Sequence, residues 1–109
     1  MKNITRAELL ENFVKIKHSE LHASYRDHID SIESDKNISE GTRRTSLVEV
    51  LLQRDREVAD IDEAVKYMST ADRTGLRDEV TRMEFAKEKS PRVIMYMRII
   101  LDIMEHYDD

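Results

Sequence analysis

The stretch SPRVIMYMRIILDIMEHY, residues 90–107, predicts the element on which the rest of the fold depends. Ser90 followed by Pro91 predicts a helix start. The serine oxygen accepts a hydrogen bond from a free N–H of the first turn, and proline at the first helical position loses no hydrogen bond there. Between residues 93 and 104 the stretch is apolar except at Arg98 and Asp102. We therefore expect a helix that is apolar around most of its circumference.

The apolar residues of this helix form two neighbouring stripes. At about 100° per residue, one stripe gathers Val93, Tyr96, Ile100, Ile103 and Tyr107, and the other gathers Ile94, Met97, Leu101 and Met104. A surface helix needs only one apolar stripe, so this helix is expected to contact at least two other elements. We expect one stripe to pack inside the chain. The second, formed by Ile94, Met97 and Leu101 with Arg98 at its edge, is predicted to bind a second copy or a target protein. The alternative is that this helix is the central hydrophobic element of a small bundle, with both stripes buried within the chain.

The composition favours a few long helices. The 109 residues include two glycines and one proline, which leaves few places for tight turns. A chain of this length is expected to form one domain around one modest core. Its formal net charge of -5, with charges of both signs mixed along the chain, opposes general binding to nucleic-acid phosphates. The apolar run is shorter than the roughly 20 residues of a membrane-spanning helix, so no membrane span is expected.

The chain has no cysteine. This excludes disulfides, thiolate zinc sites and cysteine nucleophiles, and it is compatible with a reducing compartment. No apolar segment of a secretory signal follows the first positive charges, so we expect a cytoplasmic protein.

The N-terminal third predicts one long helix. Thr5-Arg6-Ala7-Glu8 matches the capping box, in which the threonine and glutamate side chains satisfy free N–H groups at a helix start. Apolar residues continue at helical spacing to about Ser34 without a breaker, which predicts a helix of about 28 residues. The polar cluster 34–41 predicts a chain reversal.

A second long helix is expected after the reversal, with Thr42 or Thr45 as its cap. Apolar residues then follow at alternating spacings of four and three, interrupted at Arg54; they are Leu47, Leu51, Val58, Ile61, Val65 and Met68. This seam predicts either antiparallel packing on the first helix or dimerisation.

A third, shorter helix is predicted after the turn at 69–75, with Asp72 or Thr74 as its cap. Leu76, Val80 and Met83 share one of its faces. Phe85 points nearly opposite to them. We expect Phe85 to pack against the Ser90-Pro91 corner, with an exposed anchor for a partner as the alternative.

His18 and His22 are spaced so that both imidazoles can bind one metal ion on one helix face. A site needs a third ligand, and His28 lies about 15 Å from His18 along the axis. We therefore favour local hydrogen bonds for His18 and His28 and a solvated His22. A helical metal-binding protein or enzyme using His18 and His22 is one alternative function.

Arg43 and Arg44 lie where the second long helix is expected to begin. Positive charge is unfavourable beside the N-terminal end of a helix dipole, so an acidic partner or a bound anion is one explanation. We favour solvation or pairing with Glu40 or Glu49. A nucleic-acid-binding regulator using these two arginines and those of the third helix, among them Arg73, Arg77 and Arg82, is a second alternative function.

The sequence therefore predicts an all-α fold. We expect a small helical bundle with a long antiparallel hairpin, a short third helix and a highly apolar C-terminal helix. No phosphate loop or hydrolase motif is present in the sequence, and we expect neither catalysis nor a cofactor. The predicted function is a small non-enzymatic protein–protein interaction module, acting as a regulator, adaptor or inhibitor and forming a homodimer.

Overall fold

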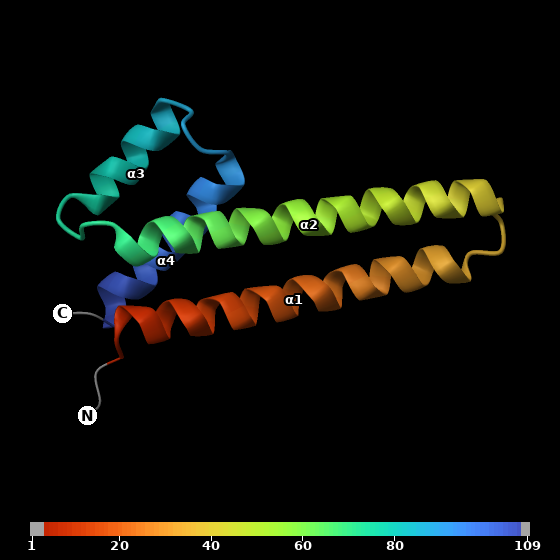
Figure 1. Cartoon of the computed structure of the whole chain (residues 1–109), viewed down its shortest axis with the longest axis horizontal. Coiled ribbons are helices and arrows are strands. Elements are labelled where there is room, and N and C mark those ends of the chain that lie inside the picture. Colours follow the sequence, from red (N-terminus) through yellow and green to blue (C-terminus); the bar gives the residue numbers. More distant parts are fainter. Residues whose placement is uncertain (1–3, 108–109) are drawn as a thin grey trace.

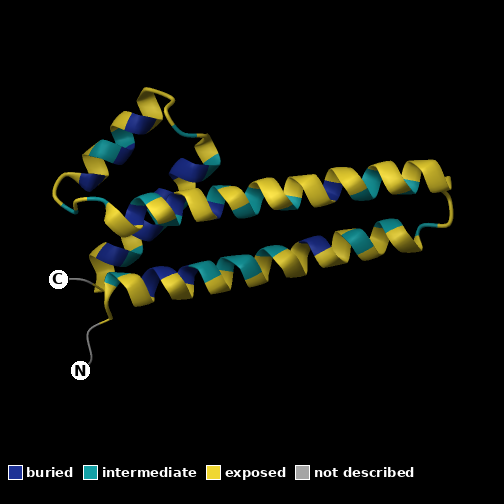
Figure 2. Cartoon of the chain, in the orientation of Figure 1, coloured by how far each residue is buried: buried dark blue, intermediate teal, exposed yellow. Residues whose placement is uncertain are grey.

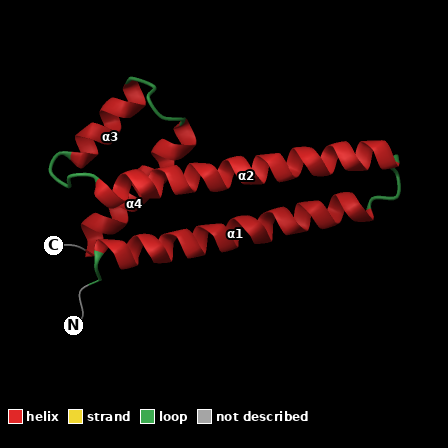
Figure 3. Cartoon of the chain, viewed as in Figure 1, coloured by secondary structure: helices red, strands yellow, loops and turns green. Residues whose placement is uncertain are grey.

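The computed structural model describes residues 4–107, and within this range the chain forms α-helices and no β-strand (Figure 3). The helices are α1 (Arg6–Ser34), α2 (Glu40–Thr70), α3 (Leu76–Phe85) and α4 (Pro91–Tyr107) (Figure 1). The all-α helical bundle predicted from the sequence is confirmed. The first three residues, which enter the expectation about a secretory signal, lie outside the described range. Across residues 4–107, none of the helices combines the length and apolar character needed to cross a membrane.

The two long helices α1 and α2 form the predicted antiparallel hairpin (Figure 1). Thr5 caps α1 as expected, because its Oγ1 accepts a hydrogen bond from the N–H of Glu8 at 3.2 Å. The predicted cap of α2 was wrong. Ser39, not Thr42 or Thr45, caps this helix, and its Oγ accepts from the N–H of Thr42 at 3.1 Å. Ser39 is the last residue with extended backbone, so α2 begins at Glu40 and Gly41 lies inside its first turn.

The shorter helices begin differently from each other. The predicted cap of α4 is confirmed, since Ser90 Oγ accepts from the N–H of Val93 at 3.3 Å. The predicted caps of α3 were wrong, because Gly75 in the left-handed conformation (φ 71°) occupies the cap position. Asp72 instead accepts from the N–H of Thr74 at 3.0 Å within the preceding turn. Glycine adopts a positive φ without steric cost, which allows the chain to turn sharply into α3, and no side chain caps this helix.

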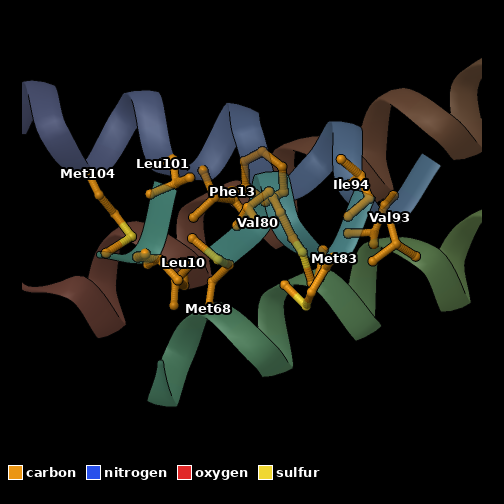
Figure 4. Packing of buried hydrophobic residues seen from close by; sticks show 14 residues of the cluster. Leu10, Phe13, Met68, Val80, Met83, Val93, Ile94, Leu101 and Met104 are labelled. Atoms are coloured by element: carbon orange, nitrogen blue, oxygen red, sulfur yellow. The ribbon is translucent and has the colours of Figure 1, made fainter. Parts of the chain in front are cut away.

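The hydrophobic core lies where α4 crosses one end of the hairpin. Figure 4 shows Leu10 and Phe13 of α1, Met68 of α2 and Val80 of α3 directed toward the side chains of α4. Six residues of α4 are buried in this core: Val93, Ile94, Met97, Ile100, Leu101 and Met104. All four helices therefore contribute to one continuous cluster.

Beyond this core the hairpin continues without a covering helix (Figures 1 and 2). We call residues 22–57 the arm. Within the arm, Tyr25 and Val50 are buried and the remaining side chains are partly or fully exposed. The radius of gyration is 17.7 Å, well above the value of about 13 Å for a compact chain of this length. The molecule is therefore elongated and thin, with extents of 55 × 38 × 16 Å.

Arg43 joins the two helices at the far end of the arm. Its guanidinium donates to the backbone carbonyl of Ile32 at 3.4 Å and to that of Asp35, and it pairs with Glu40 at 2.7 Å. The last carbonyls of a helix lack intrahelical partners and carry the negative end of the dipole. The C-terminal end of α1 thus stabilises a positive charge that is unfavourable at the start of α2.

Two further arginines make the same kind of contact. Arg6, at the start of α1, donates to the carbonyl of Ala71 at the end of α2 at 2.8 Å. Arg73, just before α3, donates to the carbonyl of Met104 in α4 at 3.3 Å. Because consecutive helices reverse direction, the start of one lies beside the end of another. Each arginine therefore satisfies a free carbonyl of a neighbouring helix.

We expect Arg43→Ala to lower the free energy of unfolding by about 1 to 2 kcal/mol, because charge-assisted hydrogen bonds to the end of α1 are lost. Lys15→Ala is the matched control, since the Lys15 side chain is 71% exposed and its ion pair with Glu11 lies at the surface of α1. Its effect should stay within about 0.5 kcal/mol. Urea unfolding followed by circular dichroism measures both. Equal losses for the two variants would contradict the capping role of Arg43.

A second prediction concerns the core. Met97 is 0% exposed and Met95, on the same helix, is 46% exposed. Met97→Ala should lower the free energy of unfolding by about 2 to 5 kcal/mol, because it removes buried atoms and leaves a cavity. Met95→Ala should change it by no more than about 0.5 kcal/mol. Thermal and urea unfolding of the pair test this difference, and similar stabilities would show that α4 is not packed as described.

Candidate interaction surface

A groove of about 380 Å³ lies where α1 and α4 meet. Its lining is mostly apolar and consists of Ile4, Leu9, Asn12, Phe13, Ile16, Lys17, Ile99, Ile103 and Tyr107. Three of the lining residues are large apolar side chains left well exposed: Ile16 at 56%, Tyr107 at 55% and Ile4 at 39%. The groove therefore presents apolar surface that the chain itself does not cover.

The base of the groove is held by aromatic packing. Phe13 is 5% exposed, and its ring meets that of Tyr96 edge-on with centroids 6.3 Å apart. Lys17 Nζ lies 5.9 Å from the centre of the Phe13 ring and 3.3 Å from a carboxylate oxygen of Glu20. Because Phe13 also belongs to the core, the base of the groove is fixed by the fold.

A second hollow of about 260 Å³ continues the groove along the same two helices. It is lined by Lys17, Glu20, Leu21, Ser24, Met95, Tyr96 and Ile99, and shares Lys17 and Ile99 with the first hollow. We call the two together the α1/α4 surface. From Leu9 to Ser24 it follows α1 for about 22 Å at 1.5 Å per residue. That is the length of a helix of about 15 residues.

The stripe predicted to bind a partner is not part of this surface. Ile94, Met97 and Leu101 are 1%, 0% and 3% exposed. They are covered within the chain, because α2 and α3 both pack against α4. This corrects the expectation that they form an open stripe. Arg98, predicted at its edge, is partly exposed and forms an ion pair with Glu84 of α3 at 2.6 Å.

The expected packing of Phe85 against the Ser90-Pro91 corner was wrong. Phe85 is 83% exposed at the end of α3. The opposite face of α3 enters the core through Leu76, Val80 and Met83, so Phe85 is directed away from it. It is an isolated aromatic on the surface, in contrast with the grouped apolar residues of the α1/α4 surface.

Among the histidines of α1, His18 connects the two helices of the hairpin. Nε2 of His18 lies 3.0 Å from Oδ1 of Asp62, which links α1 to α2. His22 and His28 are exposed. Within residues 4–107, no three histidine or acidic side chains are grouped closely enough to hold a metal ion.

The arginines of α3 are engaged with carboxylates of the chain. Arg77 pairs with Glu105 and Asp102, each at 2.8 Å, and these hydrogen bonds raise the pKa of its guanidinium. Arg82 pairs with Glu79 and Glu88. A phosphate backbone would have to compete with these carboxylates for both cations, which weakens the electrostatic case for nucleic-acid binding.

A polar cluster ties the start of α4 to the base of the arm. The phenol of Tyr25 donates to Glu57, and Arg92 lies 3.4 Å from both Glu57 and Asp60. Burial raises the pKa of Tyr25, and the hydrogen bond to Glu57 raises it further. The sequence analysis did not identify this cluster. Its signal was Glu57, a charged residue at helical spacing from the buried apolar residues of α2.

Comparison with models of protein families, with curated protein sequences and with solved structures gives no match to this chain. Its function is therefore argued from its own surface.

Proposed function

We propose that this chain is a non-enzymatic protein–protein interaction module, a small regulator, adaptor or inhibitor that acts as a homodimer. The α1/α4 surface is its binding site for a partner protein. The observation that carries the proposal is the exposed apolar lining of this surface, with Ile16 at 56% exposure in the first hollow and Met95 at 46% in the second. We place the protein in the cytoplasm, since a chain without cysteine needs no oxidising compartment.

The size of the exposed surface supports this proposal. The chain has 7632 Å² of accessible surface, whereas a compact monomer of its mass has roughly 6,300 Å². The difference exceeds the roughly 800 Å² that each partner buries in a protein–protein interface of standard size. The molecule therefore has enough excess surface for a specific interface without exposing its core.

The chemistry of the surface favours an amphipathic helix as the partner segment. Helices bind apolar grooves through side chains at i, i+3, i+4 and i+7. The apolar character expected of residues 91–107 contributes here through Met95, Ile99 and Ile103, which lie on the outer flank of α4. Met95 has a flexible thioether that adapts to irregular partners. Lys17, Glu20 and Asn12 supply polar groups at the edge, as at other interfaces.

The alternative functions have less support. The ion pairs of Arg77 and Arg82 and the contacts of Arg43 with the end of α1 engage the cations that a nucleic-acid-binding protein would use. His18 is hydrogen-bonded to Asp62. The apolar α1/α4 surface has no role in either alternative.

The partner segment can be sought directly with helical peptides. A displayed library of 15-residue amphipathic helices, with the apolar positions varied, is selected on the wild-type chain. Binders are then measured by fluorescence anisotropy. We expect micromolar binders whose affinity falls at least about tenfold on Ile16→Asp or Ile103→Asp, because a charge then lies in the apolar groove.

Phe85→Asp is the matched control, since Phe85 is 83% exposed at the end of α3, outside both the α1/α4 surface and the arm. It should leave peptide affinity unchanged. Peptides that bind the Ile16→Asp and Ile103→Asp chains as well as the wild type would contradict the proposed site. So would repeated selections that yield no binder.

A further inference from the structure

We infer that the second copy of the chain docks on the outer face of the arm, through an antiparallel contact between the two α2 helices. The inference rests on the homodimer of the proposed function and names the surface that forms it. The contact centres on Val48, Leu51 and Leu52, which we call the arm stripe. It leaves the α1/α4 surface of each chain open for a partner.

The arm stripe is apolar surface that the hairpin leaves unused. Val48, Leu51 and Leu52 are 55%, 37% and 50% exposed. Their i, i+3, i+4 spacing places them on one face of α2. Val50, which is 7% exposed, lies on the opposite face and packs inside the hairpin. The apolar seam that the sequence predicts for α2 is thus divided: Ile61 and Met68 join the core, whereas Leu51 remains at the surface.

Opposite charges flank the arm stripe on the same face of α2. Arg44 lies one turn before Val48 and Asp55 lies one turn after Leu51. At about 100° per residue, these two residues and the stripe fall within one sector of roughly 100°. Their side chains are 80% and 67% exposed, and each makes a long ion pair within the chain, Arg44 with Glu40 at 3.8 Å and Asp55 with Arg54 at 3.4 Å. Exposed ion pairs of this kind contribute little to stability, so both charges can also pair with a second chain. The stripe therefore has a positive end and a negative end.

This charge order identifies the occupant as a second copy in antiparallel orientation. The two-fold axis crosses the stripe at the level of residue 50 along α2. Val48 then meets Leu52 of the second copy, and Arg44 meets Asp55 of the second copy on each side of the axis. A parallel contact would instead bring Arg44 against Arg44. A contact between two identical surfaces requires each surface to be complementary to itself. The arm stripe meets this condition only in the antiparallel arrangement.

The shape of the molecule fits the same arrangement. The arm is a pair of helices with two buried side chains, Tyr25 and Val50, so it has little core of its own. Pairing two arms through the outer faces of their α2 helices produces a row of four helices, in which each α2 is covered by α1 of its own chain on one side and by α2 of the second copy on the other. It also places the dipoles of the two α2 helices in opposite directions, which is favourable.

Light scattering across a concentration series tests the inference with the full chain. We expect the wild type to be a dimer and Leu52→Asp to raise the dimer dissociation constant at least about 30-fold, as for a central interface residue. Because Leu52 is half exposed, the Leu52→Asp monomer should keep the helical circular dichroism of the wild type. Ile16→Asp, on the α1/α4 surface, should remain a dimer.

A charge exchange tests the orientation. Arg44→Asp alone should weaken the dimer about tenfold, because it faces Asp55 of the second copy. The double variant Arg44→Asp with Asp55→Arg should restore the wild-type dissociation constant. Failure of the double variant to restore dimerisation would overturn the antiparallel pairing.

The outcomes separate this inference from the proposed function. If Leu52→Asp dimerises like the wild type, or Ile16→Asp is a monomer, the arm contact is wrong while the homodimer stands. A wild-type chain that stays monomeric at all concentrations would overturn both the arm contact and the homodimer. Peptide binding at the α1/α4 surface would still be judged separately.

Discussion

The burial of α4 on two sides is the constraint on which the rest of the structure depends. The hairpin packs against one side of α4 through both α1 and α2. The remaining stripe, with Ile94 and Leu101, needs another cover. The short helix α3 supplies it through Leu76, Val80 and Met83. Because α4 uses only the end of the hairpin near residues 6–21 and 58–71, the other end is left without a third helix.

Contacts between the start of one helix and the end of its neighbour then stabilise the packed helices. In a chain of consecutive reversing helices, the free carbonyls of one helix lie beside the first turn of another. Arg6, Arg43 and Arg73 donate to such carbonyls. A small all-α protein with two glycines has few other devices for closing its helix ends. The arginines at helix starts, which are unfavourable in an isolated helix, thus contribute to stability in the folded chain.

Most of the helices could be predicted from the sequence because their signals are local. The capping box at Thr5 and the Ser90-Pro91 start involve residues within one turn. The contacts that were missed or wrong depend on distant segments. Whether Ile94 is covered depends on where α3 comes to lie, and whether Phe85 packs depends on the turn that follows it. Glu57 was recognisable as a charge on an apolar face, but its partner Arg92 is 35 residues further along the chain.

The distribution of apolar surface is the basis for the different roles that we propose for the two ends of the molecule. Near the core, apolar residues left over by the crossing of α1 and α4 line a groove with a fixed base, which suits a partner of defined shape. Along the arm, the unburied apolar residues form a short stripe between opposite charges, which suits a copy of itself. A helical hairpin that extends beyond its core is only marginally stable in a monomer, because a pair of helices buries little surface. In the dimer that we propose, the extra length becomes interface, and this is our physical explanation for the arm.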